Sequence, residues 1–244
     1  MFVIGMVLLS QNTKFSLNLI ISEKDSLGPV FGLYVVTDRA LSRGLSESEV
    51  ARLAYSGGAD IVQLRMKTEC GKEMLEEAIT IKRYALEYHK LFIVNDRIDI
   101  ALLSDADGVH LGQTDIPVKE ARKLLGNNKI IGKSVHNVEE AIAAVSEGAD
   151  YLGVGSIFTT TTKRDAKQSL GLEILTCIKN AVDIPIVAIG GIDRDNVESV
   201  IATGVEAIAM VSAVVSENDI AKTTKEMKTL ITMAKPNISK STLW

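Results

Sequence analysis

The chain alternates short apolar runs with longer amphipathic stretches, and it repeats this alternation eight times from residue 32 onward. Each apolar run has the length of a buried strand, and each stretch between runs has the apolar period of a helix. The predicted strands are 33–36, 61–64, 91–94, 108–111, 130–132, 151–154, 185–189 and 207–210. The predicted helices are 46–56, 72–88, 97–103, 117–125, 137–147, 171–181, 194–202 and 218–233.

Strict alternation of strand and helix predicts a parallel sheet with right-handed crossovers, and eight units predict a closed (β/α)8 TIM barrel. A doubly wound open sheet is the alternative. Such a sheet usually carries a glycine-rich nucleotide loop after its first strand, whereas residues 37–41 read Thr-Asp-Arg-Ala-Leu. We therefore expect a single barrel domain over 29–234, a poorly ordered N-terminal extension over 1–28 and a C-terminal tail over 235–244.

Composition excludes several classes of partner. The 244 residues carry a net charge of −4 and no run of lysine or arginine, which excludes a nucleic-acid footprint. The apolar residues 1–10 are too few to span a membrane and lack the basic start of a signal peptide. Cys70 and Cys177 lack metal or redox spacing, so we expect reduced thiols in a cytoplasmic protein. Small-molecule partners remain, and a homo-oligomer is left open.

The second predicted strand ends in alternating polar and apolar residues. Because successive strand side chains point to opposite faces, Gln63, Arg65 and Lys67 share one face, while Leu64 and Met66 lie on the other. In a barrel the catalytic groups gather where the strands end, so two cations and an amide there call for an anionic partner. A solvated edge strand is the alternative explanation.

Two carboxylates follow consecutive strands. Asp96 comes after the third predicted strand and Asp115 after the fourth, so both belong to the same rim and together could hold Mg2+. Each residue has an alternative role as a helix cap, because predicted helices begin near 97 and 117. A metal beside the cations Arg65 and Lys67 predicts a polyphosphate substrate.

The last three strands end in segments suited to phosphate. Gly190 and Gly191 follow the seventh strand, and Val211 and Ser212 follow the eighth, where barrels commonly bind phosphate through backbone N–H groups. A tight turn is the alternative for the glycines. Residues 159–163, four threonines and Lys163, predict a lid that offers hydroxyls and a cation.

His110 lies on the fourth predicted strand, and alternation alone does not say whether it points into the barrel or toward the helices. We expect it to be hydrogen-bonded within the barrel wall rather than catalytic. No Ser-His-Asp order or activated cysteine indicates covalent catalysis. Two anion sites and a metal together indicate joining or splitting of phosphorylated molecules.

Taken together these motifs resemble the thiamine-phosphate synthase family over roughly residues 32–216. The resemblance rests on eight segments in the family's order, which are Tyr34-x-Val36-Thr37-Asp38, Gln63-Leu64-Arg65-x-Lys67, Asn95-Asp96-Arg97-x-Asp99-Ile100-Ala101, Asp107-Gly108-Val109-His110-Leu111-Gly112-Gln113-x-Asp115, Gly132-x-Ser134-x-His136, Gly148-Ala149-Asp150-Tyr151-x-Gly153-x-Gly155, Phe158-x-Thr160-x-Thr162-Lys163 and Ala188-Ile189-Gly190-Gly191-Ile192. The family is a barrel transferase. It joins hydroxymethylpyrimidine diphosphate to hydroxyethylthiazole phosphate with Mg2+, giving thiamine monophosphate and pyrophosphate.

The resemblance implies a role for each matching residue. Asp96 and Asp115 would hold Mg2+, and Gln63 would help to place the pyrimidine. The diphosphate would be held by catalytic residues Arg65, Lys67, Asn95, Ser134 and Lys163. Leu64 and Met66 would also belong to the substrate-binding residues. The thiazole phosphate site would comprise Thr160, Thr161, Thr162, Gly191, Val211 and Ser212. The family's proposed chemistry is dissociative, so it needs charge stabilisation and positioning more than a general base.

Two departures and two alternatives accompany the resemblance. Met66 stands where the family often has an acid, and Thr159 stands where it often has proline, whose fixed φ would stiffen the lid. A thiazole tautomerase-like isomerase shares the barrel but lacks the metal and diphosphate residues. A non-catalytic binding protein for thiamine precursors would keep the phosphate site without needing the two carboxylates.

Overall fold

The structure is a computed structural model that describes residues 32–160 and 169–235. Its strands are β1 (Leu33–Val36), β2 (Ile61–Leu64), β3 (Leu91–Asn95), β4 (Gly108–Leu111), β5 (Ile130–Val135), β6 (Tyr151–Val154), β7 (Ile186–Ile189) and β8 (Ala207–Met210). They are all parallel and close in sequence order, with β1 paired to both β2 and β8. The predicted (β/α)8 barrel is confirmed, and the open sheet is excluded.

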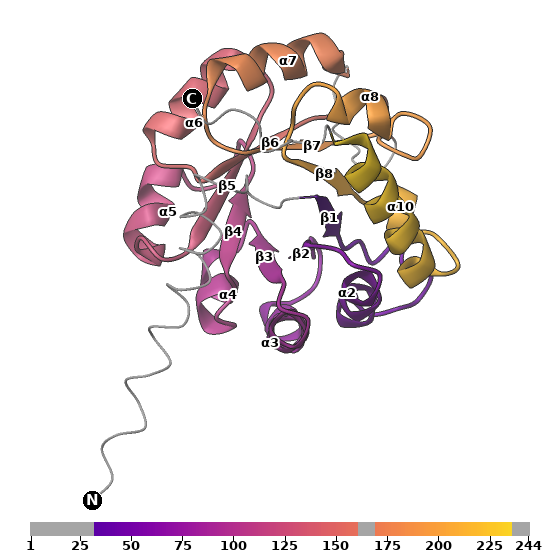
Figure 1. Ribbon diagram of the computed structural model, residues 1–244. Helices are drawn as coiled ribbons and strands as arrows, with labels where there is room; N and C mark the ends of the chain where they lie inside the picture. Colours follow the sequence, from indigo (N-terminus) through magenta and orange to yellow (C-terminus); the bar gives the residue numbers. More distant parts are fainter. Residues whose placement is uncertain (1–31, 161–168, 236–244) are drawn as a thin grey trace, which may run out of the picture.

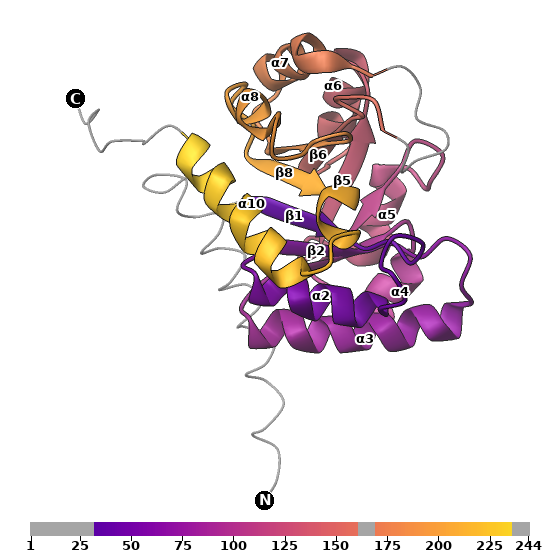
Figure 2. The same cartoon turned by 90° about the vertical axis from the view of Figure 1, so that its right-hand side faces the viewer.

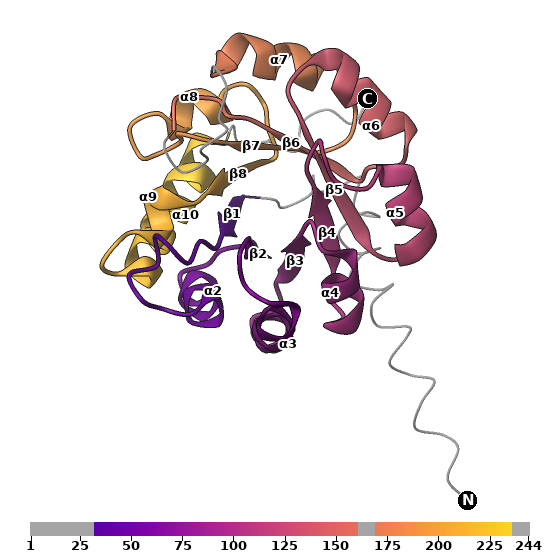
Figure 3. The ribbon, with the colours of Figure 1, turned by 180° about the vertical axis from the view of Figure 1, so that it is seen from behind.

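Helices surround the strands as an outer ring (Figure 1). They are α2 (Glu47–Ser56), α3 (Gly71–Glu87), α4 (Ile98–Leu103), α5 (Val118–Leu125), α6 (Val138–Ser146), α7 (Gly171–Ala181), α8 (Val197–Ile201), α9 (Ser212–Val215) and α10 (Ile220–Ala234). The short α9 was not predicted from the sequence, and it lies between β8 and α10 (Figure 3). Ser46 starts α2 with a capping box, as its side chain accepts from Glu49 N while Glu49 accepts from Ser46 N.

Two predicted elements differ from the observed ones by more than two residues at one end. β5 continues through residues 133–135, because these residues pair with Leu152–Val154 of β6. That pairing is long-range, so the local pattern of polar residues did not reveal it. α8 begins at Val197 rather than 194, since Asp193 and Asn196 bind nearby backbone N–H groups and form a turn instead.

Strand alternation divides the apolar residues into two clusters. One fills the barrel interior, where Tyr34, Ile93 and Tyr151 pack with smaller residues such as Ala207 and Ala209. The other lies between the outer faces of the strands and the helices. The side view shows α10 and α2 along the outside of β1 and β2, with α3 beside α2 (Figure 2). The barrel interior is therefore filled by side chains and is not an open pore.

Four acids tie the amino ends of the strands together. Each acid directly precedes an even-numbered strand. It accepts from the backbone N–H of one of the first two residues of the strand before it. The pairs are Asp60 with Leu33 N (3.0 Å), Asp107 with Phe92 N (2.8 Å), Asp150 with Ile131 N (2.7 Å) and Glu206 with Ile186 N (2.8 Å). Each acid also pairs with one or more cations, namely Lys90 and Lys228, Lys82, Arg122 and Lys179 respectively. We call these four acids the amino-end ring.

The predicted extension 1–28 and all but Lys235 of the predicted tail lie outside the described residues. Among the residues that the structure does describe, no helix combines the length and apolar character needed to cross a lipid bilayer.

Candidate active site at the carboxyl ends of the strands

The side chains at the end of β2 lie on the faces that strand alternation predicts. Gln63 points into the barrel, where its Nε2 donates to the hydroxyl of Tyr34 at 2.7 Å. Leu64 and Met66 are buried in the layer between strands and helices. Any contact of Leu64 or Met66 with a substrate would therefore come from their backbone. The difference from the family at Met66 does not change a side chain of the barrel mouth.

Arg65 and Lys67 are each held by a carboxylate from a neighbouring unit. Arg65 Nη1 lies 2.6 Å from Asp38 Oδ2, and Arg65 N donates to Thr37 Oγ1 at 3.1 Å. Lys67 Nζ pairs with Asp96 Oδ2. The side chains of Arg65 and Lys67 remain 26% and 52% exposed, so both stay accessible to a ligand. Asp38 is a site residue to which the sequence reasoning assigned no role, although it lies within a quoted motif.

Asp96 and Asp115 lie together on the rim, and neither caps a helix. The first residues of α4 and α5 have no side-chain cap, which removes the alternative role considered for both acids. Asp115 Oδ2 accepts from Gly112 N at 2.6 Å. Burial and the contact with the Asp96 carboxyl group raise the pKa of Asp115 above its ordinary value. Two carboxyl groups so close are a pair that a cation would stabilise.

Asn95 ends β3 and Ser134 lies on β5, the two strands that pair with β4. Asn95 Nδ2 is buried without a hydrogen-bond partner among the described residues, which is an unfavourable state unless a ligand supplies an acceptor. Ser134 lies within β5, and its Oγ is 2.9 Å from Nε2 of His110. His110 itself points into the barrel, which settles the question that alternation left open.

The loops after β6 and β7 come close together. Phe158 N donates to Gly190 O at 3.0 Å, and a Cβ on Gly191 would lie only 2.7 Å from the carbonyl oxygen of Thr159. Gly191 also has φ +67°, so a side chain is unfavourable there for two reasons. Thr160 is the next residue along the β6 loop after Thr159. Thr161, Thr162 and Lys163 lie outside the described residues. Val211 and Ser212 follow β8, and Ser212 begins α9.

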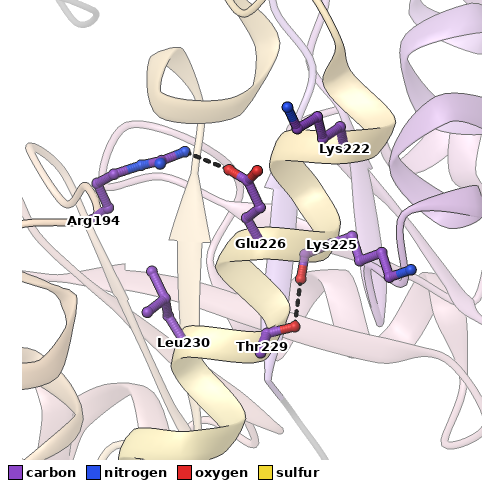
Figure 4. A pocket seen from close by; sticks show the side chains of 6 residues that line it. All are labelled: Arg194, Lys222, Lys225, Glu226, Thr229 and Leu230. Atoms are coloured by element: carbon purple, nitrogen blue, oxygen red, sulfur yellow. Dashed lines mark hydrogen bonds and ion pairs between the residues drawn. The ribbon is translucent and has the colours of Figure 1, made fainter.

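A groove of about 490 Å³ lies elsewhere, along the outer side of α10 (Figure 4). It is lined by Arg194, Lys222, Lys225, Glu226, Thr229 and Leu230, and Arg194 is paired with Glu226 at 2.7 Å. None of the predicted site residues lines this groove. The convergence of Arg65, Lys67 and the two carboxyl groups makes the barrel mouth the candidate site instead.

Comparison with known proteins identifies the family of this chain. Residues 33–214 match the sequence model of the thiamine monophosphate synthase family. A thiamine-phosphate synthase of Chloroflexus aurantiacus is 49% identical over 201 residues, which cover 82% of this chain and 93% of that protein. One from Methanosarcina barkeri is 50% identical over 204 residues, covering 84% and 92%.

Solved structures give the same result. A thiamine phosphate pyrophosphorylase from Pyrococcus furiosus superposes with a TM-score of 0.78 at 45% identity, covering 84% of this chain and 96% of that one. A 3-hexulose-6-phosphate synthase has a TM-score of 0.61 at 20% identity, a likeness of fold alone. The chain therefore belongs to the thiamine monophosphate synthase family and is a transferase with thiamine-phosphate synthase activity.

Proposed function

We propose that the barrel mouth binds hydroxymethylpyrimidine diphosphate beside Asp96 and Asp115 and transfers its pyrimidine-methyl group to the nitrogen of hydroxyethylthiazole phosphate. The observation that carries the proposal is the contact between the two carboxyl groups, with Lys67 paired to Asp96. Carboxylates and a lysine on one rim suit a diphosphate that arrives with a divalent cation.

The donor set at Asp96 and Asp115 fits Mg2+. No group of three or more His, Cys, Asp or Glu side chains able to hold a metal occurs within residues 32–160 and 169–235. Mg2+ is commonly bound through one or two carboxylates, with water and substrate phosphate oxygens completing its shell. When bound, Mg2+ would offset the negative charge that grows on the departing pyrophosphate.

The chain's own residues would bind and orient the diphosphate. Arg65, held in place by Asp38, and Lys67 would face phosphate oxygens as charge-assisted donors. Asn95 Nδ2 would gain the acceptor that it lacks. Ser134 and Lys163 complete the proposed set, and Gln63 would orient the pyrimidine. A dissociative step of this kind depends on such preorganised donors rather than on a general base.

The second substrate would bind on the opposite arc of the mouth. Gly191 and the backbone at Val211 would approach the thiazole phosphate closely, with hydroxyls from Ser212, Thr160, Thr161 and Thr162. The hydrogen bond between the Phe158 and Gly190 loops supports a shared site, because it brings the ends of β6 and β7 together. The nitrogen of the thiazole would then face the pyrimidine methyl carbon.

The isomerase and the non-catalytic binding protein are not favoured, since the relatives compared above are thiamine-phosphate synthases. Cys70 and Cys177 are free thiols, which supports a cytoplasmic location. The test is an assay of purified protein with both phosphorylated precursors and Mg2+. We expect thiamine phosphate and pyrophosphate in equal amounts. Folded protein that forms neither product would overturn the proposal.

A further inference from the structure

A chain of side-chain hydrogen bonds crosses the barrel interior from Gln63 to Ser134. Gln63 Nε2 donates to the Tyr34 hydroxyl at 2.7 Å, and that hydroxyl lies 3.1 Å from the hydroxyl of Tyr151. The Tyr151 hydroxyl lies 2.9 Å from Nδ1 of His110, whose Nε2 lies 2.9 Å from Ser134 Oγ. Gln63, at one end of this series of hydrogen bonds, is the residue proposed to orient the pyrimidine. Ser134, at the other end, is proposed to bind the diphosphate. Its three middle members have no role in the proposed function.

Two glycines make room for the rings of this chain. A Cβ on Gly132 would lie 2.1 Å from the Tyr151 ring, and one on Gly153 would lie 2.8 Å from the His110 ring. Gly132 pairs directly with Tyr151, and Gly153 pairs with Ser134 across the sheet. A barrel interior is ordinarily filled by branched apolar residues. Here two positions are kept open so that polar rings can reach one another.

The order of donors follows from counting protons. Tyr34 and Tyr151 are 1% and 5% exposed, and burial raises the pKa of both, so each hydroxyl keeps a proton that needs an acceptor. Because Tyr34 accepts from Gln63, its own proton goes to Tyr151, and the proton of Tyr151 goes to His110 Nδ1. A neutral imidazole then carries its proton on Nε2 and donates it to Ser134 Oγ.

We propose that Tyr34, Tyr151 and His110 are positioning residues whose hydrogen bonds run in one direction, so that the Ser134 hydroxyl donates its own proton to an oxygen of the departing diphosphate. This inference rests on the proposed role of Ser134. His110 acts through Ser134 and touches no substrate. The chain fixes a donor in advance of the reaction, which is the kind of preorganisation that stabilises developing charge.

The direction of the chain is measured by 15N NMR of histidine-labelled full-length protein. The sequence has three histidines, and the signal lost in His110→Gln assigns His110. We expect a protonated Nε2 and an unprotonated Nδ1. A proton on Nδ1 alone would overturn the inference, because Nε2 would then accept from Ser134. Protons on both nitrogens would also overturn it, because Tyr151 could not donate to Nδ1 and the hydrogen bonds would not run in one direction.

Kinetics test whether the chain acts through Ser134. Tyr151→Phe keeps the ring and removes one hydroxyl, so we expect kcat to fall about tenfold with little change in KM for the pyrimidine diphosphate. The matched control is Tyr55→Phe, which removes a buried hydroxyl that donates to Leu91 O at 2.8 Å outside the barrel, and it should keep wild-type kcat. Equal kcat for the two variants would overturn the inference.

A double variant separates this inference from the proposed function. Tyr151→Phe added to Ser134→Ala should lower kcat no further than Ser134→Ala alone, because both remove the same donor. Additive losses would contradict action through Ser134. A Ser134→Ala protein with wild-type kcat would instead refute the proposed role of Ser134, and the measured state of the His110 ring would stand independently.

Discussion

The two rims of the barrel differ in how their polar groups are satisfied. At the amino ends of the strands, each acid of the amino-end ring accepts from a backbone N–H and pairs with at least one cation. At the carboxyl ends, Asp96 also pairs with Lys67 and Asp115 accepts from Gly112 N, but the two carboxyl groups contact each other, and Asn95 Nδ2 has no partner in the described structure. Satisfied groups stabilise a fold, whereas unsatisfied groups await a ligand.

Backbone geometry at Asp96 is unusual, although positive φ occurs at both rims, since His89 before β3 and Asp105 before β4 have φ +53°. Asp96, at the carboxyl-end rim, has φ +61°, an uncommon conformation for a residue with a side chain. Strain of this kind persists where the surrounding structure enforces it and is concentrated at functional sites. The comparison therefore predicts that substitutions at the carboxyl ends lower activity and that substitutions in the amino-end ring lower stability.

The largest effect is expected for Asp96→Asn. Asparagine tolerates positive φ, so the fold should persist while turnover falls by at least about 1,000-fold through loss of a metal ligand. The matched control is Asp105→Asn, because Asp105 also has positive φ, +53°, but is a surface partner of Lys129. Steady-state kinetics and thermal melts of both variants give the comparison. Wild-type turnover in Asp96→Asn would contradict the metal assignment.

Asp107→Asn should have the next largest effect, on stability. It leaves the ammonium group of Lys82, whose side chain is only 10% exposed, without its anion at 2.7 Å. We expect the free energy of unfolding in urea to fall by about 3 kcal/mol, with kcat of the folded protein unchanged. A large loss of kcat without loss of stability would contradict the prediction that the amino-end ring affects stability and not activity.

Asn95→Ala should lower affinity without lowering stability. The amide that it removes makes no hydrogen bond through Nδ2, so the folded protein loses little, while binding of pyrophosphate with Mg2+ should weaken about tenfold. Calorimetric titration measures the binding. As a control, Asn137→Ala removes a satisfied cap of α6 that accepts from Glu140 N, and should destabilise the protein by about 1 kcal/mol.

Glu206→Gln should give the smallest change. Its pair with Lys179 is 22% exposed on both sides, so solvent screens it more than the pair of Asp107 and Lys82. Glutamine can still accept from Ile186 N, and we expect a loss of about 1 kcal/mol or less in urea unfolding. A loss of stability as large as that of Asp107→Asn would show that burial does not determine how much each ion pair of the amino-end ring contributes to stability.

Most of the fold could be predicted from the sequence because its signals are local. Each strand lies within a residue or two of its predicted bounds except β5, whose extension depends on pairing with β6. The short α9 and the late start of α8 were missed, since both depend on turns formed by a few side-chain and backbone bonds. The amino-end ring was not predicted, because its bonds join residues that are distant in sequence.

The sequence by itself determined the barrel, the rim on which the polar residues gather and the face of Arg65 and Lys67. Periodicity and chain order suffice for these, because strand alternation and parallel closure leave few arrangements. Only the tertiary structure decided that Asp38 holds Arg65, that Asp96 contacts Asp115, and that His110 points inward to Tyr151 and Ser134. These contacts join residues distant in sequence, so they exist only after the barrel has closed.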